Sequence, residues 1–450
     1  MAKEKIAVID GGGRGSALID KYLESPHVES AIAIPGNDMM SIGKEKPVEI
    51  FPKLKTTDVR DIVELCRKEK VTFVDIAQEN AVEAGLADAL ENAGIPALGP
   101  TKQAGEIESD KIFGRLFGRK HNLPQPMFAF FDLEDAGVMF IEKGRERPVF
   151  IKANGLCEGK GAIPAKTKEE ALDGIRRMKE FKHGAGRRYL IEDWLTNDDG
   201  SNGEEFSAFG ISDGQTVKML GYAQDHKRAE NSDTGKNTGG TGCSTPPLVL
   251  TDKIKRSVES FFNTTVAGLA AEGRTYRGVL YLGGILVRRQ NSLEPYIIEW
   301  NDRWGDPECQ VILPGIKSDL FEIGIAAVNN KVKELKIESD GKARVAVAGM
   351  SRGYPDNYDS VKGKRIFGLE DAMEMEGVKV YGAGVDVVDG RYYARGGRLF
   401  HIVGEGRDVI EARKRAYAAM SSVYIEGNNL HYRTDIGWRD VARLAELPKL

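Results

Sequence analysis

The sequence predicts a mixed α/β and α+β protein of several domains. Its 450 residues are too many for one hydrophobic core, and a typical domain size of about 150 residues suggests roughly three. Near the N-terminus, apolar runs alternate with helical patterns, which is the rhythm of a doubly wound parallel sheet. Near the C-terminus, short apolar runs separated by turn residues indicate antiparallel strands.

The first domain opens with a βα unit. "KIAVIDGGGRGSALIDKYLES" predicts a buried strand over residues 6–9, a glycine turn and an amphipathic helix from Ser16. The apolar runs and helical pattern that follow lie at 31–36, 58–70, 72–77 and 95–100. We expect the domain to end near Pro100, and we assign it residues 1–102.

The second domain, 103–331, is expected to contain a small subdomain at about 124–195. Strand patterns at 147–155 and 188–195 are separated by a helical pattern at 167–181. The first strand runs into a glycine-rich loop. Strands that flank such a loop indicate a subdomain that covers a nucleotide.

The remaining chain gives two further expectations. The stretch 223–242 is nearly free of large apolar side chains, and a loop of that length inside a compact domain is usually functional or disordered. We assign residues 332–450 to a C-terminal domain, in which 378–404 has the pattern of an antiparallel meander with a turn at Asp389-Gly390.

Composition excludes several classes of function. A hydrophobic content of 41% and a charged content of 29% are those of a soluble globular protein. The net charge of −4 argues against a general nucleic-acid or membrane-surface binder. We therefore expect small-molecule partners, no nucleic acid and no membrane, and a monomer or homodimer.

The cysteines and the N-terminus bear on the compartment. Four cysteines without CxxC spacing indicate neither a zinc site nor a disulfide framework, and they favour a reducing cytoplasm. The apolar run before the first glycines is about four residues long, which is too short for a signal peptide.

Two glycine-rich segments are candidate anion sites. "DGGGRGS", 10–16, lies at a strand-to-helix junction, where backbone N–H groups, the helix dipole and Arg14 could bind a phosphate. It lacks the GxGxxG spacing and the acidic partner of an NAD site, and a tight structural turn is the alternative. "KANGLCEGKGA", 152–162, suits a flap that neutralises a triphosphate, although a solvated surface loop fits equally.

Carboxylates supply the other candidates. Glu192 in "IEDWL" and Glu205 in "GEEFS" could accept from an adenine amino group and ribose hydroxyls, or be ordinary hairpin charges. In "EWNDRWGDPE", Glu299 and Asn301 alternate along one strand, so they face the same side and offer the oxygen ligands that Mg²⁺ prefers. Arg303 could contact a transferred phosphoryl group.

The stretch 223–242 contributes charges at its start. Asp225, His226, Lys227 and Arg228 could hold an amino acid or a phosphate. A lone histidine is more often structural, so His226 is not assigned a catalytic role.

In this order, "KANGLCEGKG", "IEDWL...GEEFS", "QDHKR...DTGKNTGGTG" and "EWNDRWGDPECQ" resemble the phosphoribosylamine-glycine ligases of the ATP-grasp superfamily. The resemblance runs from "GGGR" near the start to "YRTDIGWR" at 432–439. It implies a Rossmann-like N-terminal domain, an ATP-grasp body with a lid subdomain, and a C-terminal domain. The implied reaction joins glycine to 5-phosphoribosylamine through glycyl phosphate, with ATP as the phosphoryl donor.

The resemblance also implies site residues. ATP would be held by Lys111, Lys152, Gly155, Gly159, Gly161, Glu192, Asp193, Trp194, Leu195 and Glu205, and Mg²⁺ or Mn²⁺ by Glu299 and Asn301. Arg303, Lys160 and Asp225 would be catalytic. The substrates would be bound by Gly13, Arg14, Asn37, Glu79, Asp225, Lys227, Asn237, Thr238, Gly239 and Asp306.

The departures from the family pattern lie mostly where its members bind phosphoribosylamine. Gly15-Ser16 replaces Glu-His after "GGR", and "AQENAVEAG", 77–85, lacks the usual Gly-Pro before Glu79. Lys236, Thr241 and Cys243 also depart, and the 196–202 loop is longer than usual. Two alternatives therefore stay open: a paralogue that joins another carboxylate to another amine, and a catalytically silent ATP-binding regulator.

Overall fold

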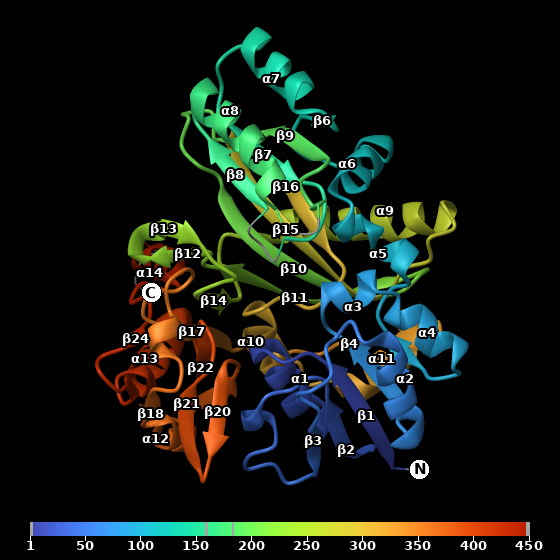
Figure 1. The fold of residues 1–450 in the computed structure, drawn as a ribbon, viewed down its shortest axis with the longest axis vertical. Coiled ribbons are helices and arrows are strands. Elements are labelled where there is room, and N and C mark those ends of the chain that lie inside the picture. The colour runs from blue at the N-terminus through green and yellow to red at the C-terminus, as the bar shows by residue number, and fades with distance from the viewer. Residues whose placement is uncertain (1–2, 158–160, 182–183, 447–450) are drawn as a thin grey trace.

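The computed structural model describes residues 3–157, 161–181 and 184–446. Within them the chain has the predicted mixed α/β and α+β fold, arranged as three parts (Figure 1). The N-terminal sheet lies at the lower right of the view, a small lid at the top, and the C-terminal strands at the lower left. No helix in this described part is long and apolar enough to cross a membrane.

The N-terminal part is a parallel sheet in the order β3-β2-β1-β4-β5. Its strands are β1 (Glu4–Ile9), β2 (Val28–Ala33), β3 (Val48–Ile50), β4 (Phe73–Ile76) and β5 (Ala97–Leu98). Its helices are α1 (Gly13–Leu23), α2 (Val59–Lys68), α3 (Glu79–Glu83) and α4 (Leu86–Asn92). Ile6 to Ile9 are fully buried, as a strand covered on both faces requires.

Two helices, α5 (Lys102–Ser109) and α6 (Lys111–Lys120), lead to the lid. The lid is an antiparallel sheet in the order β6-β9-β7-β8. Its elements are β6 (Phe128–Phe131), α7 (Glu134–Lys143), β7 (Val149–Ala153), β8 (Ala162–Ala165), α8 (Lys168–Arg177) and β9 (Tyr189–Asp193). Alternate residues of β7 and β9, such as Ile151 and Ile191, pack with α8 in a separate small core.

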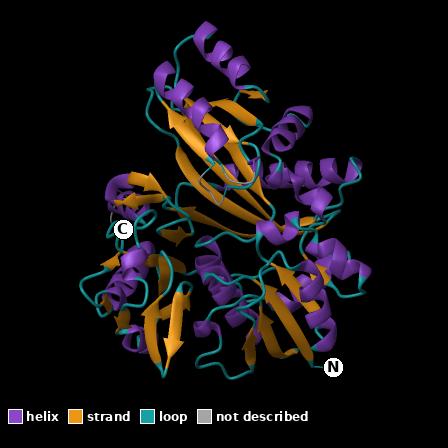
Figure 2. Ribbon diagram, in the orientation of Figure 1, coloured by secondary structure: helices purple, strands orange, loops and turns teal. Residues whose placement is uncertain are grey.

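One large antiparallel sheet joins the body to the C-terminal part. Its order is β16-β15-β10-β11-β14-β17-β22-β19, with β24 (Leu430–His431) paired to β17. The body strands are β10 (Glu204–Asp213), β11 (Val217–Asp225), β14 (Gly242–Thr245), β15 (Arg277–Arg289) and β16 (Ser292–Asn301). The later strands are β17 (Ala343–Ser351), β19 (Val378–Gly382) and β22 (Arg398–Gly406). Figure 2 shows these strands running through the molecule with helices around them.

The helices of this region are α9 (Asp252–Ala271), α10 (Glu308–Ile312), α11 (Leu320–Val328), α12 (Leu369–Glu374), α13 (Val409–Met420) and α14 (Trp438–Glu446). A second C-terminal sheet has the order β20-β21-β18-β23. Its strands are β18 (Arg365–Phe367), β20 (Val385–Val388), β21 (Arg391–Ala394) and β23 (Tyr424–Ile425). Because β14 pairs with β17, strand pairing crosses the predicted 331/332 boundary.

Two expectations need correction. The turn at Asp389-Gly390 joins β20 to β21, but 378–404 is not one meander, because β19 pairs with β22 in the large sheet while β20 and β21 pair in the small one. The stretch 223–242 is not a structureless loop, because it contains the hairpin of β12 (Arg228–Glu230) and β13 (Thr234–Asn237).

One hydrophobic core unites the N-terminal sheet with the body. It contains Leu18 and Phe73 from the first part together with Phe209, Tyr281 and Trp304 from the second. The rings of Phe209 and Tyr281 stack with centroids 4.5 Å apart. This shared core fixes the end of β16 against the N-terminus of α1.

Candidate active site

Glu299, near the end of β16, lies at the centre of a cluster of cations. It pairs with Gly283 of β15, where a Cβ would lie 3.0 Å from Cγ of Glu299, so the glycine makes room for this side chain. Burial raises the pKa of Glu299, but four cations outweigh that effect and lower it. In order of effect they are Lys227, Lys152, Lys111 and Arg303. Such a cluster suits a polyphosphate with its metal ion.

Asn301 follows Glu299 on the same face of β16. It is buried, and its Nδ2 has no hydrogen-bond partner among the described residues. A carboxylate and an amide oxygen on one strand face are hard ligands, and the unpartnered amide leaves Asn301 uncommitted. These residues therefore fit a magnesium-like cation.

A buried carboxylate, Glu192 on β9, holds Lys152 in place. Its Oε2 lies 2.7 Å from Nζ of Lys152, and Arg115 of α6 donates to both of its oxygens, at 2.7 and 3.0 Å. Arg115 also donates to the carbonyls of Ile297 and Ile298 in β16. We call Glu192, Lys152 and Arg115 the Glu192 node. It joins the lid, α6 and the strand that carries Glu299.

The charges of this node are strongly coupled. Burial raises the pKa of Glu192, but Arg115 and Lys152 lower it to about 2. Both carboxylate oxygens are already engaged, so a contact from Glu192 to adenine stays a prediction. Arg115 could not be predicted from the sequence, because a basic residue on a helix has no signature and its partner is 77 positions away.

Hydrogen bonds connect α6 to the loop that follows β7 in the lid. Nζ of Lys111 donates to the carbonyl of Gly155 at 3.2 Å, and the N–H of Ile112 donates to Oδ1 of Asn154 at 2.8 Å. The carbonyl of Gly161 accepts from the N–H of Ala153. Gly159 and Lys160, predicted to bind ATP and to act in catalysis, lie outside the described residues.

Residues 193–195 connect the lid to β10. The ring of Trp194 lies 4.6 Å from that of Phe150, and Asp193 pairs with Arg147 at 2.7 Å. Leu195 is half-buried beside them. This segment stands next to the node of Glu192, and its contact with adenine stays a prediction.

Arg303 forms ion pairs with two carboxylates. Its Nε lies 3.0 Å from Glu79, at the start of α3, and its Nη2 lies 3.4 Å from Glu108 of α5. Burial raises the pKa of Glu79, but Arg303 and Arg14 lower it to about 2. Glu79 therefore orients Arg303. Glu108 was not among the predicted residues.

Asp225 and Lys227 flank the end of β11. Oδ1 of Asp225 is buried and has no hydrogen-bond partner in the described part of the chain. Burial and the nearby Glu308 raise the pKa of Asp225 well above its usual value. Lys227 and Arg398 lower this pKa, but their effect is smaller. Glu205, 3.2 Å from Nζ, raises the pKa of Lys227 well above its usual value, while burial opposes the shift.

Arg398 of β22 brings the C-terminal part into the site. It pairs with Asp306 at 3.0 Å and donates to the carbonyl of Gly239 at 2.7 Å. Burial raises the pKa of Asp306, but Arg398 and His401 lower it to about 2. Of the predicted residues Asn237, Thr238 and Gly239, Arg398 thus links Gly239 to Asp306. Oγ1 of Thr238 donates instead to the carbonyl of Lys227 at 2.9 Å, and Asn237 pairs with Arg228 in the β12–β13 hairpin. Arg398 was missed because its partners are distant in the sequence.

The N-terminus of α1 meets the same region. A Cβ on Gly13 would lie 2.5 Å from Nδ1 of His401, so only glycine fits there. Arg14 is buried and pairs with Asp10 at 2.8 Å, and its Nη1 donates to the carbonyl of Trp304 at 2.6 Å.

Asn37 lies fully buried beneath this terminus. Its Nδ2 donates to the carbonyls of Gly11 and Gly382 and to Oγ of Ser16, and its Oδ1 accepts from the N–H of Met39. A substrate contact from its amide stays a prediction.

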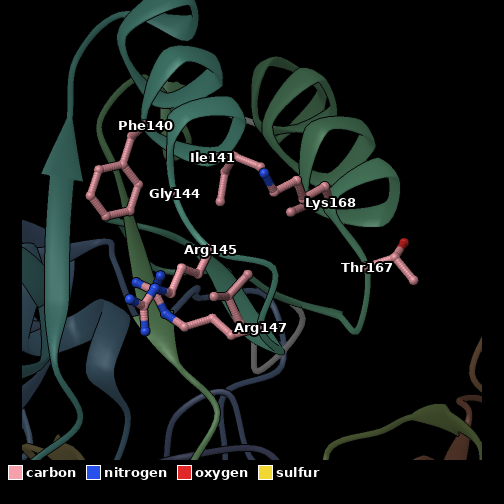
Figure 3. Close-up of a pocket in the computed structure, with 9 residues that line it drawn as sticks. Phe140, Ile141, Gly144, Arg145, Arg147, Thr167 and Lys168 are labelled. Carbon is pink, nitrogen blue, oxygen red and sulfur yellow. The ribbon is translucent and has the colours of Figure 1, made fainter.

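A small pocket lies in the lid and includes Arg147, the partner of Asp193. Figure 3 shows it between α7 and α8, lined by Phe140, Arg145, Arg147 and Lys168 among others. Its volume of about 10 Å³ accommodates at most one water molecule.

Comparisons with known proteins agree with this arrangement. The chain matches three family domains, described as Phosphoribosylglycinamide synthetase N domain over 4–108, ATP-grasp (A) domain over 109–309 and C domain over 344–439. It is 37% identical to a phosphoribosylamine–glycine ligase of Salmonella typhi over 98% of this chain and 99% of that protein. The corresponding ligase of Vibrio parahaemolyticus is 35% identical, with 98% and 100% covered.

Solved structures show the same fold. The crystal structure of a phosphoribosylamine–glycine ligase from Thermotoga maritima matches with a TM-score of 0.79 and 26% identity, covering 96% of this chain and 99% of that one. A biotin carboxylase from Campylobacter jejuni has a TM-score of 0.69 at 14% identity, covering 99% and 95%, which reflects the fold alone. The chain therefore belongs to the phosphoribosylglycinamide synthetase family, whose ATP-grasp body and two flanking domains account for its three parts.

Proposed function

We propose that this chain is an ATP-dependent, ADP-forming ligase that joins glycine to 5-phosphoribosylamine and yields glycinamide ribonucleotide. The observation that carries the proposal is the convergence of Lys111, Lys152, Lys227 and Arg303 on Glu299. Family membership supplies the substrates. Phosphoryl transfer depends chiefly on positioning and on neutralising charge, and this cluster provides both.

In the proposed reaction, the glycine carboxylate attacks the γ-phosphoryl group of ATP, and ADP leaves. The amine of phosphoribosylamine then attacks the resulting glycyl phosphate, and inorganic phosphate leaves. Lys111 and Lys152 hold the nucleotide phosphates, and Arg303, oriented by Glu79, steadies the transferred group. A bound Mg²⁺ or Mn²⁺, held by Glu299 and Asn301, would neutralise phosphate charge.

The substrate half is proposed to lie between the body and the C-terminal part. Oδ1 of Asp225 and the carbonyl oxygen of Asp306 both border Gly240, 3.0 and 3.2 Å from a Cβ built there. Arg398 pairs with Asp306 and donates to the carbonyl of Gly239. Gly13 and Arg14 border the same space from α1. The predicted domain boundaries at 102/103 and 331/332 and the cytoplasmic location remain part of the proposal, the latter supported by four cysteines that show no CxxC spacing.

The direct test is ADP release by the purified protein with ATP, Mg²⁺ and glycine, with and without freshly generated phosphoribosylamine, together with the mass of the product. Amine-dependent ADP and the mass of glycinamide ribonucleotide are expected. ATP binding without amine-dependent turnover would reject this acceptor and direct the search to other amines.

The metal assignment has its own test. Glu299→Gln removes the charged oxygen ligand, and we expect at least a hundredfold loss of ADP formation with an unchanged unfolding temperature. Glu294→Gln, the same change at an exposed position of β16, is the matched control. A folded Glu299→Gln protein with normal turnover would rule out Glu299 as a metal ligand.

A further inference from the structure

The N-terminus of α1 is occupied by a carboxylate of the chain itself. Asp10 directly follows β1 and is fully buried. Its Oδ1 accepts from the N–H groups of Gly12 at 2.5 Å and Gly15 at 3.1 Å. Its Oδ2 accepts from Nε of Arg14 at 2.9 Å and from Nε2 of Gln78 at 3.0 Å.

These donors are the groups that bind phosphate at helix termini, namely backbone N–H groups of the first turn and a guanidinium. A phosphate at this position would have to displace the Asp10 carboxylate or lie against a like charge. A second carboxylate adds to the effect, since Oδ2 of Asp306 would lie 3.3 Å from a Cβ built on Gly12. The predicted phosphate site is therefore already filled by an anion.

Two departures from the family pattern converge on this carboxylate. Gly15 stands where the family usually has glutamate, and a Cβ there would lie 2.8 Å from Oδ1 and 2.9 Å from Cβ of Asp10. A side chain at this position would thus push Asp10 out. Gln78 stands where the family usually has proline, and it supplies a donor that proline cannot. Asp10, Gly15 and Gln78 form one physical unit.

We infer that Asp10 is a specificity-determining residue, an internal anion that keeps the phosphate of the acceptor amine away from the N-terminus of α1. The inference rests on the proposed function, in which the acceptor carries a phosphate. Nε and Nη2 of Arg14 contact Asp10, and its Nη1 donates to the carbonyl of Trp304. A phosphate could therefore bind only the N–H groups of Arg14 that these two contacts leave unused. Asp10 thereby lowers the affinity for phosphorylated acceptors.

The test is the binding of ribose 5-phosphate, a stable molecule with the sugar and phosphate of the proposed acceptor, measured by titration calorimetry. Asp10→Asn is expected to lower its Kd at least about tenfold, because a like charge within contact distance is removed. Ribose without phosphate should change less than about twofold. Adding Arg14→Ala to Asp10→Asn should abolish the gain.

Asp20→Asn is the matched control, because it removes the same charge from α1 at a position paired with Lys44, and its Kd should equal that of the wild type. Equal Kd values for wild type and Asp10→Asn would overturn the inference. If Asp10→Asn does not fold, a crystal structure of the wild type with ribose 5-phosphate decides. A phosphate bonded to the N–H groups of Gly12 and Gly15 overturns the inference, and a phosphate elsewhere supports it.

The ligase assay on the wild type remains separate from this test. A failed assay rejects the acceptor, whereas an unchanged Kd in a protein that does form glycinamide ribonucleotide rejects only the role of Asp10.

Discussion

At the scale of single residues, Glu192 shows how a buried charge is balanced. Its carboxylate is paired with Arg115 and Lys152, and this pairing depresses its pKa to about 2, against burial, from an ordinary value of 4.5. A depressed carboxyl pKa means that folding favours the charged form. Its contribution to stability is present above about pH 4.5 and is lost as the pH falls toward 2.

We therefore expect Glu192→Gln to destabilise the protein by about 3 kcal/mol at pH 7. The difference from wild type should shrink as the pH falls to 3, measured by urea unfolding at each pH. Glu169→Gln, an exposed change on α8 of the same lid, should alter stability by less than about 0.5 kcal/mol. A difference that stays constant between pH 7 and pH 3 would refute the assignment.

Sequence patterns reach some of these residues and not others. Glu299 and Asn301 could be placed on one side of a strand because strand alternation is local. Arg115, Glu108 and Arg398 could not, since each acquires its role from a partner far along the chain. The position of Asp10 at the N-terminus of α1 could not be predicted either. The sequence "DGGGRGS" contains the hydrogen-bond donors, but it does not show which acceptor binds them.

At the scale of elements, the hairpin β12–β13 shows what the "YRTDIGWR" segment does. Arg433, fully buried, donates to Asp233 at 2.8 Å and to the carbonyl of Arg228 at 3.1 Å. Arg439 also pairs with Asp233, and the N–H of Gly437 donates to Nε2 of His226. The segment thus fixes the hairpin that leads into Asn237 to Gly239, and His226 has the structural role that its isolation suggested.

We expect Asp233→Asn to lower stability by about 2 kcal/mol, because it removes one of the two carboxylates that pair with the buried Arg433 and leaves Asp435 as the other. It should also raise KM for the acceptor amine several-fold and leave KM for ATP within about twofold, since Lys111 and Lys152 lie elsewhere. Lys236→Ala breaks an exposed pair between the same hairpin and Asp356, so it should cost less than about 1 kcal/mol. If the two changes had equal effects in steady-state kinetics and thermal unfolding, the 432–439 segment would not be what fixes the hairpin.

At the scale of the whole molecule, sequence patterns predicted three parts but not how they are joined. Apolar runs and glycine turns identify the parallel sheet near the N-terminus because both signals are local. The pairing of β14 with β17 joins residues about a hundred positions apart, from Gly242–Val347 to Thr245–Arg344. The periodicity of apolar residues does not predict a contact between such distant positions. The sequence patterns therefore do not show that the sheet continues across 331/332.

The continuous sheet predicts that β14 and β17 open together. Native-state hydrogen exchange should place the amides of 242–245 and 343–351 in one cooperative unit, with opening free energies within about 1 kcal/mol. Val345→Ala removes fully buried methyl groups from β17 and should lower the opening energy of both strands by about 2 kcal/mol. Val149→Ala, the same change in the lid core, should affect β7 and β9 but not β14. If Val345→Ala destabilises β17 and leaves β14 protected, the body and the C-terminal part are independent folding units, and the shared sheet serves only to align Arg398 with Asp306.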